Sequence, residues 1–133
     1  MANYSATIRT NYFSVKDPTA LRELIDSVEA EDTVSLFMTK LPDGSMQYGF
    51  GCYGSLFGIQ DSLDAFYEAL QELVCENDAI LIFEVGYEKL RYVVGCCTVI
   101  TSTKMQHIDI QQQALELAAK LLNRPNYNTR LDY

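Results

Sequence analysis

The sequence lacks tryptophan and has a single histidine, His107, among its 133 residues. Basic residues are also few: ten Lys and Arg stand against 18 Asp and Glu, which gives a net charge of −8 at pH 7. Such a surface repels phosphate backbones, so direct binding to nucleic acid is disfavoured. One histidine alone cannot form a His-rich metal site, and no partner for a Ser–His–Asp triad can be identified. We therefore expect His107 to have no catalytic role, and we expect no metal and no cofactor.

Long hydrophobic runs are missing as well. No apolar stretch reaches the roughly 18–20 residues that a membrane helix needs. Residues 1–15 also lack the basic start and apolar block of a secretory leader. We expect a cytoplasmic protein with no membrane partner. Its length and its 48% hydrophobic residues indicate a single domain, residues 1–133, with one core.

The four cysteines form no C-x-x-C pair; they are Cys52, Cys75, Cys96 and Cys97. Cys96 and Cys97 are neighbours in a predicted strand, so their side chains point to opposite faces and do not readily share one metal. A domain of this size also builds an adequate core without disulfides. We expect four free thiols in a reducing compartment.

Hydrophobic periodicity predicts the element order β-α-β-β-α-β-β-α. The strands are expected at residues 4–15, 33–41, 46–53, 79–85 and 90–101. The helices are expected to begin at Asp17-Pro18, at Asp61 or Ser62, and near Asp109, and Pro125 ends the last one. Residues 29–32 and 54–60 are expected to be loops, and residues 42–44 and 86–89 to be turns. The first six elements match a ferredoxin-like sandwich, so we predict an α+β fold: an antiparallel sheet, helices on one face, an extra strand and a C-terminal helix.

Charge is divided unevenly along the chain. Residues 17–78 carry thirteen acids against Arg22 and Lys40, a net charge of −11, while the remaining residues carry +3. If the first two helices lie side by side on one face of the sheet, their outer surfaces form one negative patch with residues 29–32. The carboxylates that we expect in this patch are Glu23, Asp26, Glu29, Glu31, Asp32, Asp64, Glu68, Glu72 and Glu76.

Three interpretations of this patch remain open. Charged helix faces are common and keep a small protein soluble. Alternatively, the carboxylates occupy the positions of phosphates and bind the basic surface of a nucleic-acid-binding protein, with fast and salt-sensitive association. Cation binding is the third interpretation, although no segment matches the ligand spacing of a calcium loop.

Two other features invite a functional interpretation. Residues 49–54 match G-x-G-x-x-G, but a hairpin strand precedes them and the next helix begins too late for a dinucleotide site. We expect a bent or bulged strand, with glycines where the sheet twists or where another backbone comes close. Glu84 interrupts an apolar run, and Lys89 or Arg91 across the following turn is its expected partner. A Glu84 with a raised pKa could act as a general base, and the enzymatic alternative is an enzyme that uses the glycine-rich loop with Glu84 or a cysteine.

Aromatic residues are frequent on and beside the predicted strands, for example Tyr48, Tyr53 and Phe57. Exposed aromatics on a sheet stack bases in RNA-recognition domains, but the basic strand motif of that family is absent. Core packing or a protein interface is the expected role of these rings.

Three segments resemble those of small acidic proteins carried by phages and conjugative elements of Gram-positive bacteria. They are residues 6–13 (ATIRTNYF), 48–51 (YGFG) and 88–95 (EKLRYVVG). The resemblance implies no catalytic residues, but it implies a context, because such proteins often block restriction or CRISPR nucleases, some of them by resembling DNA. The sequence thus predicts a non-enzymatic protein that inhibits a nucleic-acid-handling defence protein through its acidic helical face. The alternative is a structural or regulatory module that forms a homodimer through a sheet edge or the tyrosine-rich hairpin.

Overall fold

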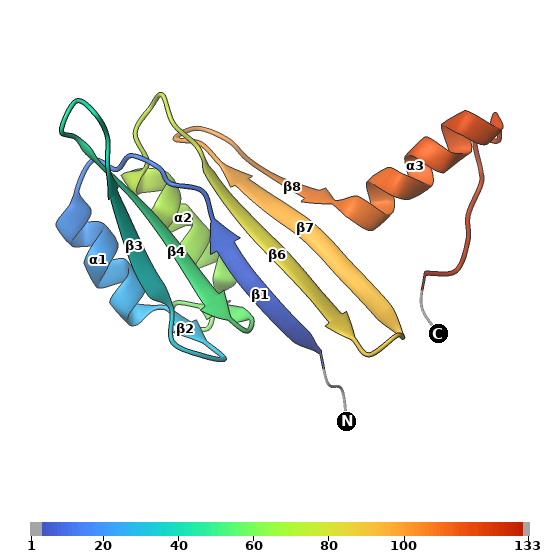
Figure 1. Ribbon diagram of the computed structural model, residues 1–133, viewed down its shortest axis with the longest axis horizontal. Helices are drawn as coiled ribbons and strands as arrows, with labels where there is room; N and C mark the ends of the chain where they lie inside the picture. The colour runs from blue at the N-terminus through green and yellow to red at the C-terminus, as the bar shows by residue number, and fades with distance from the viewer. Residues whose placement is uncertain (1–3, 132–133) are drawn as a thin grey trace.

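The computed structural model describes residues 4–131 and shows an α+β fold (Figure 1). Along the chain the elements are β1 (Ser5–Thr10), α1 (Pro18–Ser27), β2 (Glu29–Ala30), β3 (Ser35–Lys40), β4 (Met46–Tyr53), β5 (Leu56–Gly58), α2 (Leu63–Leu73), β6 (Ile80–Glu88), β7 (Tyr92–Ile100), β8 (Met105–Asp109) and α3 (Ile110–Leu122). None of the helices in this part of the chain is long and apolar enough to cross a bilayer.

The main sheet has six antiparallel strands in the order β3-β4-β1-β6-β7-β8. Strand β1 is central, although it comes first in the chain: Ile8 pairs with Cys52 of β4 on one side and with Glu84 of β6 on the other. Short strands β2 and β5 form a separate two-stranded sheet. The hairpin β3–β4 turns at Pro42-Asp43-Gly44 as predicted, and Gly44 takes the positive φ of +93° that this turn needs.

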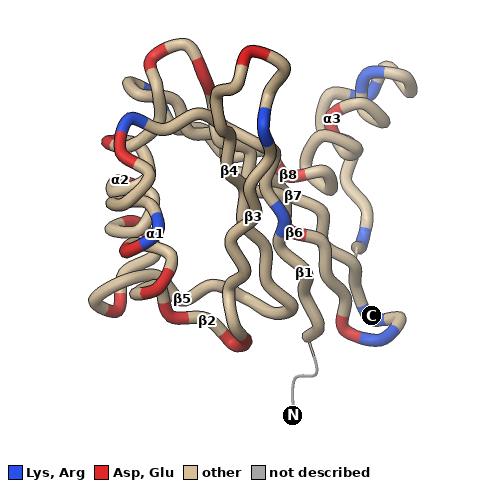
Figure 2. Tube along the Cα trace, turned by 60° about the vertical axis from the view of Figure 1, so that its left-hand side comes forward, with Lys and Arg blue, Asp and Glu red and all other residues tan. Residues whose placement is uncertain are grey.

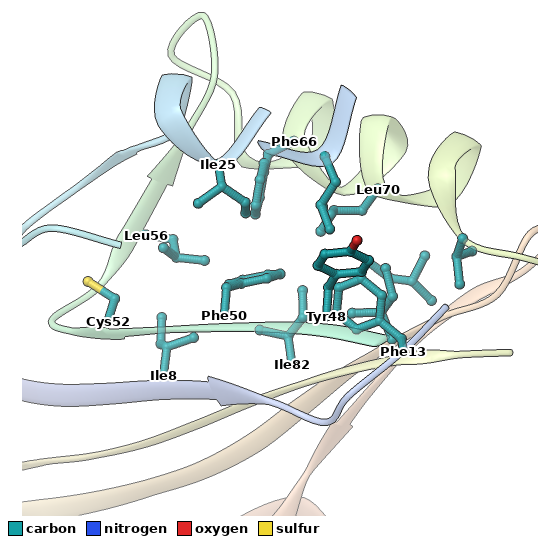
Figure 3. Close-up of a cluster of buried hydrophobic side chains, with 14 residues drawn as sticks. Ile8, Phe13, Ile25, Tyr48, Phe50, Cys52, Leu56, Phe66, Leu70 and Ile82 are labelled. Atoms are coloured by element: carbon teal, nitrogen blue, oxygen red, sulfur yellow. The ribbon is translucent and has the colours of Figure 1, made fainter. Parts of the chain in front are cut away.

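Helices α1 and α2 cover one face of the sheet, because alternating residues of the strands present their apolar side chains to that face. Figure 3 shows Phe66 and Leu70 of α2 lying opposite Phe50 and Ile82 of the sheet. The rings of Phe50 and Phe66 meet edge to face, 5.8 Å between centroids, and both are fully buried. This layer between sheet and helices is the hydrophobic core.

Helices α1 and α2 begin at caps that the sequence predicts, and α3 begins next to Asp109, near which its start was expected. Asp17 precedes Pro18 and accepts hydrogen bonds from the backbone N–H groups of Thr19 and Ala20. Ser62, rather than Asp61, caps α2, and Asp109 caps α3. These side chains satisfy N–H groups that have no partner within a helix.

Several parts of the prediction were wrong. The first strand was expected to reach residue 15 but ends at Thr10, and beyond it Phe13 and Val15 form only isolated bridges. Residues 29–32 and 54–60 are not only loops, because β2 and β5 pair within them. Residues 86–88 continue β6, and the turn lies at residues 89–91 instead. The chain also adds β8, which carries His107 and pairs with β7, so two strands rather than one extend the sheet. Short or polar strands such as these lack a clear apolar alternation, and tertiary pairing decides them.

The opposite face of the main sheet has no helix lying flat against it. We call it the open face; its exposed apolar residues are Tyr53, Phe83, Val85, Tyr87, Val93 and Ile108. Helix α3 stands on this side, away from α1 and α2 (Figure 2), and its first residue, Ile110, packs over Gly95 of β7. No residue of α3 is buried.

Candidate functional site

The nine predicted carboxylates lie on one side of the molecule. Figure 2 shows acidic residues along α1, α2 and the β2–β5 region, all on the side of the sheet away from α3. Every one of the nine is exposed. We call this set the acidic layer: Glu23, Asp26, Glu29, Glu31, Asp32, Asp64, Glu68, Glu72 and Glu76.

Packing of the two helices brings the parts of the layer together. Leu21 and Ile25 of α1, and Phe66 and Leu70 of α2, are buried against the sheet, so the polar sides of both helices face outward. A shallow hollow runs between the helices, with Ala69 and Leu73 among its apolar lining residues. Glu23 of α1 and Glu72 of α2 also line it, so carboxylates from both helices meet at one apolar depression.

A second hollow lies where α1 leads into β2. Its lining includes the carboxylates of Asp26, Glu29, Glu31 and Asp32, and its apolar part includes the half-exposed ring of Phe57. Phe57 comes from β5, which pairs with β2 and so carries the ring to the acidic residues. In the sequence Phe57 is one aromatic residue among many, and nothing there indicates the three-residue strand that carries it.

The carboxylates of the layer are not neutralised within residues 4–131. The ion pair found there joins Arg91 to Glu88, N to O 3.6 Å, and involves no residue of the layer. Glu31 accepts a hydrogen bond from the backbone N–H of Ser55, and Asp32 accepts one from that of Thr33. These bonds hold two carboxylates in the second hollow and leave the charge of the layer uncompensated.

Two basic residues lie close to the acidic layer. Arg22 belongs to α1, but its guanidinium group reaches toward Met38 of β3, Nη2 to Sδ 3.6 Å. Lys16 lies beside the end of α2, where its backbone N–H bonds the carbonyl of Leu73. The layer is therefore strongly negative but bordered by two cations.

Glu84 differs from the prediction. It accepts a hydrogen bond from the Tyr4 hydroxyl, Oη to Oε2 2.8 Å, while Arg91 pairs with Glu88. Burial and this hydrogen bond raise the pKa of the Tyr4 phenol above its usual value of 10.0. Across the β6–β7 pair lies Cys96, and burial together with the Glu84 charge raises the pKa of its thiol. A raised thiol pKa opposes formation of the thiolate, so this pair does not have the properties of a nucleophilic site.

Gly49 and Gly51 allow the backbones of neighbouring strands to approach closely. A Cβ on Gly49 would lie 2.9 Å from the carbonyl oxygen of Asn11, and one on Gly51 would lie 2.9 Å from that of Ile8. Both glycines belong to β4, not to a loop that opens a helix. The close backbone approach predicted from the sequence is confirmed. Residues 4–131 also hold no group of three or more His, Cys, Asp or Glu side chains arranged to bind a metal ion.

The chain was compared with protein-family models, curated proteins and solved structures. No protein-family model, no curated protein and no solved structure matches the chain.

Proposed function

We propose that this protein works by binding, and that its acidic layer contacts the basic, nucleic-acid-binding surface of another protein. The observation that carries the proposal is the gathering of nine exposed carboxylates, without ion-pair partners in the described chain, on one side of the fold. A surface of one sign steers a partner of the opposite sign and speeds the encounter.

The spacing of the carboxylates supports a resemblance to nucleic acid. Asp64, Glu68 and Glu72 follow one another at intervals of four residues on α2. A helix rises about 1.5 Å per residue, so these side chains recur about every 6 Å. Neighbouring phosphates of one DNA strand lie about 7 Å apart, because each step rises about 3.4 Å and also turns about the duplex axis. A binding site for a phosphate backbone therefore meets charges of similar spacing on this helix.

The two hollows suit the side chains that such a partner presents. Arginine and lysine bury an apolar stem while their charged end stays polar. Phe57 and its apolar neighbours in the second hollow offer a surface for that stem and for a cation–π contact, and Asp26 and Glu29 offer carboxylates at its rim. This combination favours binding of a basic protein over a purely solubilising role.

The resemblance of residues 6–13, 48–51 and 88–95 to proteins of mobile elements narrows the partner class. We propose that the partner is a nucleic-acid-handling protein of bacterial defence, of the restriction or CRISPR type, and that the acidic layer inhibits it. We also infer that β1–α1–β3–β4–α2–β6 forms a ferredoxin-like unit. The strand order β3-β4-β1-β6, antiparallel throughout, supports this inference.

Affinity capture from bacterial extract, followed by competition with duplex DNA, tests the proposal. We expect the captured proteins to be nucleic-acid-binding proteins that are released both by salt and by DNA, since both act on the same charges. Partners that stay bound in high salt and in excess DNA would contradict it.

Charge reversal on α2 gives the matching mutational test. We expect Glu68→Lys with Glu72→Lys to weaken binding of the captured partner by about thirtyfold, because each reversal replaces an attraction of up to about 1 kcal/mol with a repulsion. The matched control, Asp43→Lys with Glu116→Lys, makes the same change of charge outside the layer and should leave the Kd within about threefold. Equal losses in the two variants, measured by calorimetry, would assign the effect to net charge alone.

A further inference from the structure

The open face and α3 form a second surface with properties opposite to those of the acidic layer. Among the described residues of the six main-sheet strands that point to the open face, Arg9 is the one charged residue. Its guanidinium lies over the ring of Phe37, 4.2 Å from the ring centroid. No carboxylate lies at an open-face position of these strands. The surface is therefore apolar and almost uncharged.

Helix α3 carries an apolar stripe that its own chain leaves uncovered. Ile110, Ala114, Leu117 and Leu121 recur at helical spacing, and all four are exposed, Leu121 to 77%. Ile110 and Gln113, which lie on the same side of the helix as the stripe, line a notch with Phe83, Val85 and Ile108 of the sheet. The stripe thus begins in this notch and faces the open face without lying on it.

From these observations we propose that the surface is covered by a second copy of this chain. In a two-fold dimer the α3 helix of each copy lies in the notch of the other and places its stripe on the other's open face. Each chain then supplies both an exposed apolar helix and an exposed apolar sheet face. A two-fold interface requires such a self-complementary surface, because the same patch of each copy contacts the other.

The available area fits such a dimer. Aromatic side chains bury about 150–250 Å² each and aliphatic ones about 100 Å². From their exposed fractions, the open-face residues and the stripe offer about 700 Å² per copy. A specific interface uses about 800 Å² per partner, whereas the largest apolar patch of a typical monomer measures about 300–600 Å².

Charge favours the same arrangement. Two chains of net charge −8 repel each other, most strongly through their acidic layers. The proposed interface contains no carboxylate of the layer and leaves both layers on the outer sides of the dimer, free for another partner. The dimer does not depend on the proposed function.

Sedimentation of the full chain over a series of concentrations and salt concentrations tests the dimer. We expect a mass of twice 15.0 kDa at high concentration, and we expect the dimer to strengthen as salt screens the repulsion. A mass of 15.0 kDa at every concentration would overturn the proposal and assign the open face to a different partner.

Paired substitutions test which surfaces meet. Leu117→Lys places a positive charge in the stripe, and Val85→Asp places a negative charge on the open face, so each variant alone should be monomeric. An equimolar mixture of the two should dimerise again, because the introduced ammonium group of one copy then meets the introduced carboxylate of the other while the second contact stays native. A mixture that remains monomeric would overturn the helix-on-sheet contact.

A matched control lies on the same helix. Leu122 is 52% exposed, close to the 56% of Leu117, but it lies outside the stripe. Leu122→Lys should therefore remain dimeric, and loss of its dimer would contradict the assignment of the stripe. Circular dichroism of each variant confirms that the fold is retained, since both leucines are exposed in the single chain.

Discussion

At the scale of single residues, the Tyr4–Glu84 hydrogen bond links the start of the chain to the middle of the sheet. Glu84 lies in an apolar strand, and Tyr4 is its partner in place of a cation. The Tyr4 ring also stacks on Tyr92 of β7, 6.1 Å between centroids. The sequence identified Glu84 as unusual but not its partner, because the two residues are 80 positions apart.

Tyr4→Phe should lower the free energy of unfolding by about 1–3 kcal/mol near neutral pH, because the Glu84 carboxylate loses its donor. The folded state raises the pKa of the Tyr4 phenol, so the contribution of this group is complete below its usual pKa of 10.0 and is lost as the pH rises above that value. Urea denaturation at several pH values should therefore show the difference between wild type and variant shrinking in alkali. Tyr53→Phe is the control, since that ring is 80% exposed. A difference that grows with pH would contradict this account.

At the scale of elements, the sequence predicts best those features that depend on residues close together in the chain, such as helix caps and tight turns. The prediction from the sequence agrees with the structure at the Asp17 cap, at the start of α3 near Asp109, at the turn of residues 42–44 and over the span of β4. The strands that were missed, β2, β5 and β8, depend on partners elsewhere in the chain for their hydrogen bonds. The candidate site shows the same contrast between local and distant contacts. The helix pattern predicts the exposed positions of its helical carboxylates, whereas Phe57 lies in the second hollow only because β5 pairs with β2.

Asp17→Ala should lower the free energy of unfolding by about 1 kcal/mol, because two backbone N–H groups of α1 lose their acceptor. Asp26→Ala on the same helix removes an equal charge from an exposed position and should change stability by at most about 0.5 kcal/mol. Thermal and urea denaturation of the two variants distinguish a cap from a charge effect. Equal losses would mean that the Asp17 cap contributes nothing.

At the scale of the whole molecule, the distribution of charge gives the two sides of the sheet different surfaces. The side covered by α1 and α2 carries the acidic layer, and the open face carries apolar residues. The two proposed contacts, one weakened and one strengthened by salt, would therefore lie on opposite sides of one sheet. The two proposals can accordingly be tested in the same protein without interfering with each other.

The acidic layer should also make stability depend on salt. Asp64, Glu68 and Glu72 form two like-charge pairs four residues apart, each unfavourable by about 0.2–0.5 kcal/mol. Raising the salt concentration from low to physiological values should therefore increase the free energy of unfolding by up to about 1 kcal/mol. In Glu68→Lys the increase should disappear, because the introduced lysine then lies between Asp64 and Glu72 and both pairs become attractive. An equal increase in this variant would show that the layer is not its source.

The central place of β1 affects how the chain is made. This strand leaves the ribosome well before β6, and the Asn11 side chain just beyond it donates to the Ala79 carbonyl and accepts from the Leu81 N–H, 68 and 70 positions later. Synthesis proceeds at about 5–20 residues per second, so β1 waits several seconds for β6 to emerge. Through that interval one edge of the nascent sheet lacks its neighbour and is open to pairing with other chains. We therefore expect the yield of this protein to depend on protection of that edge during synthesis as well as on the stability of the finished fold.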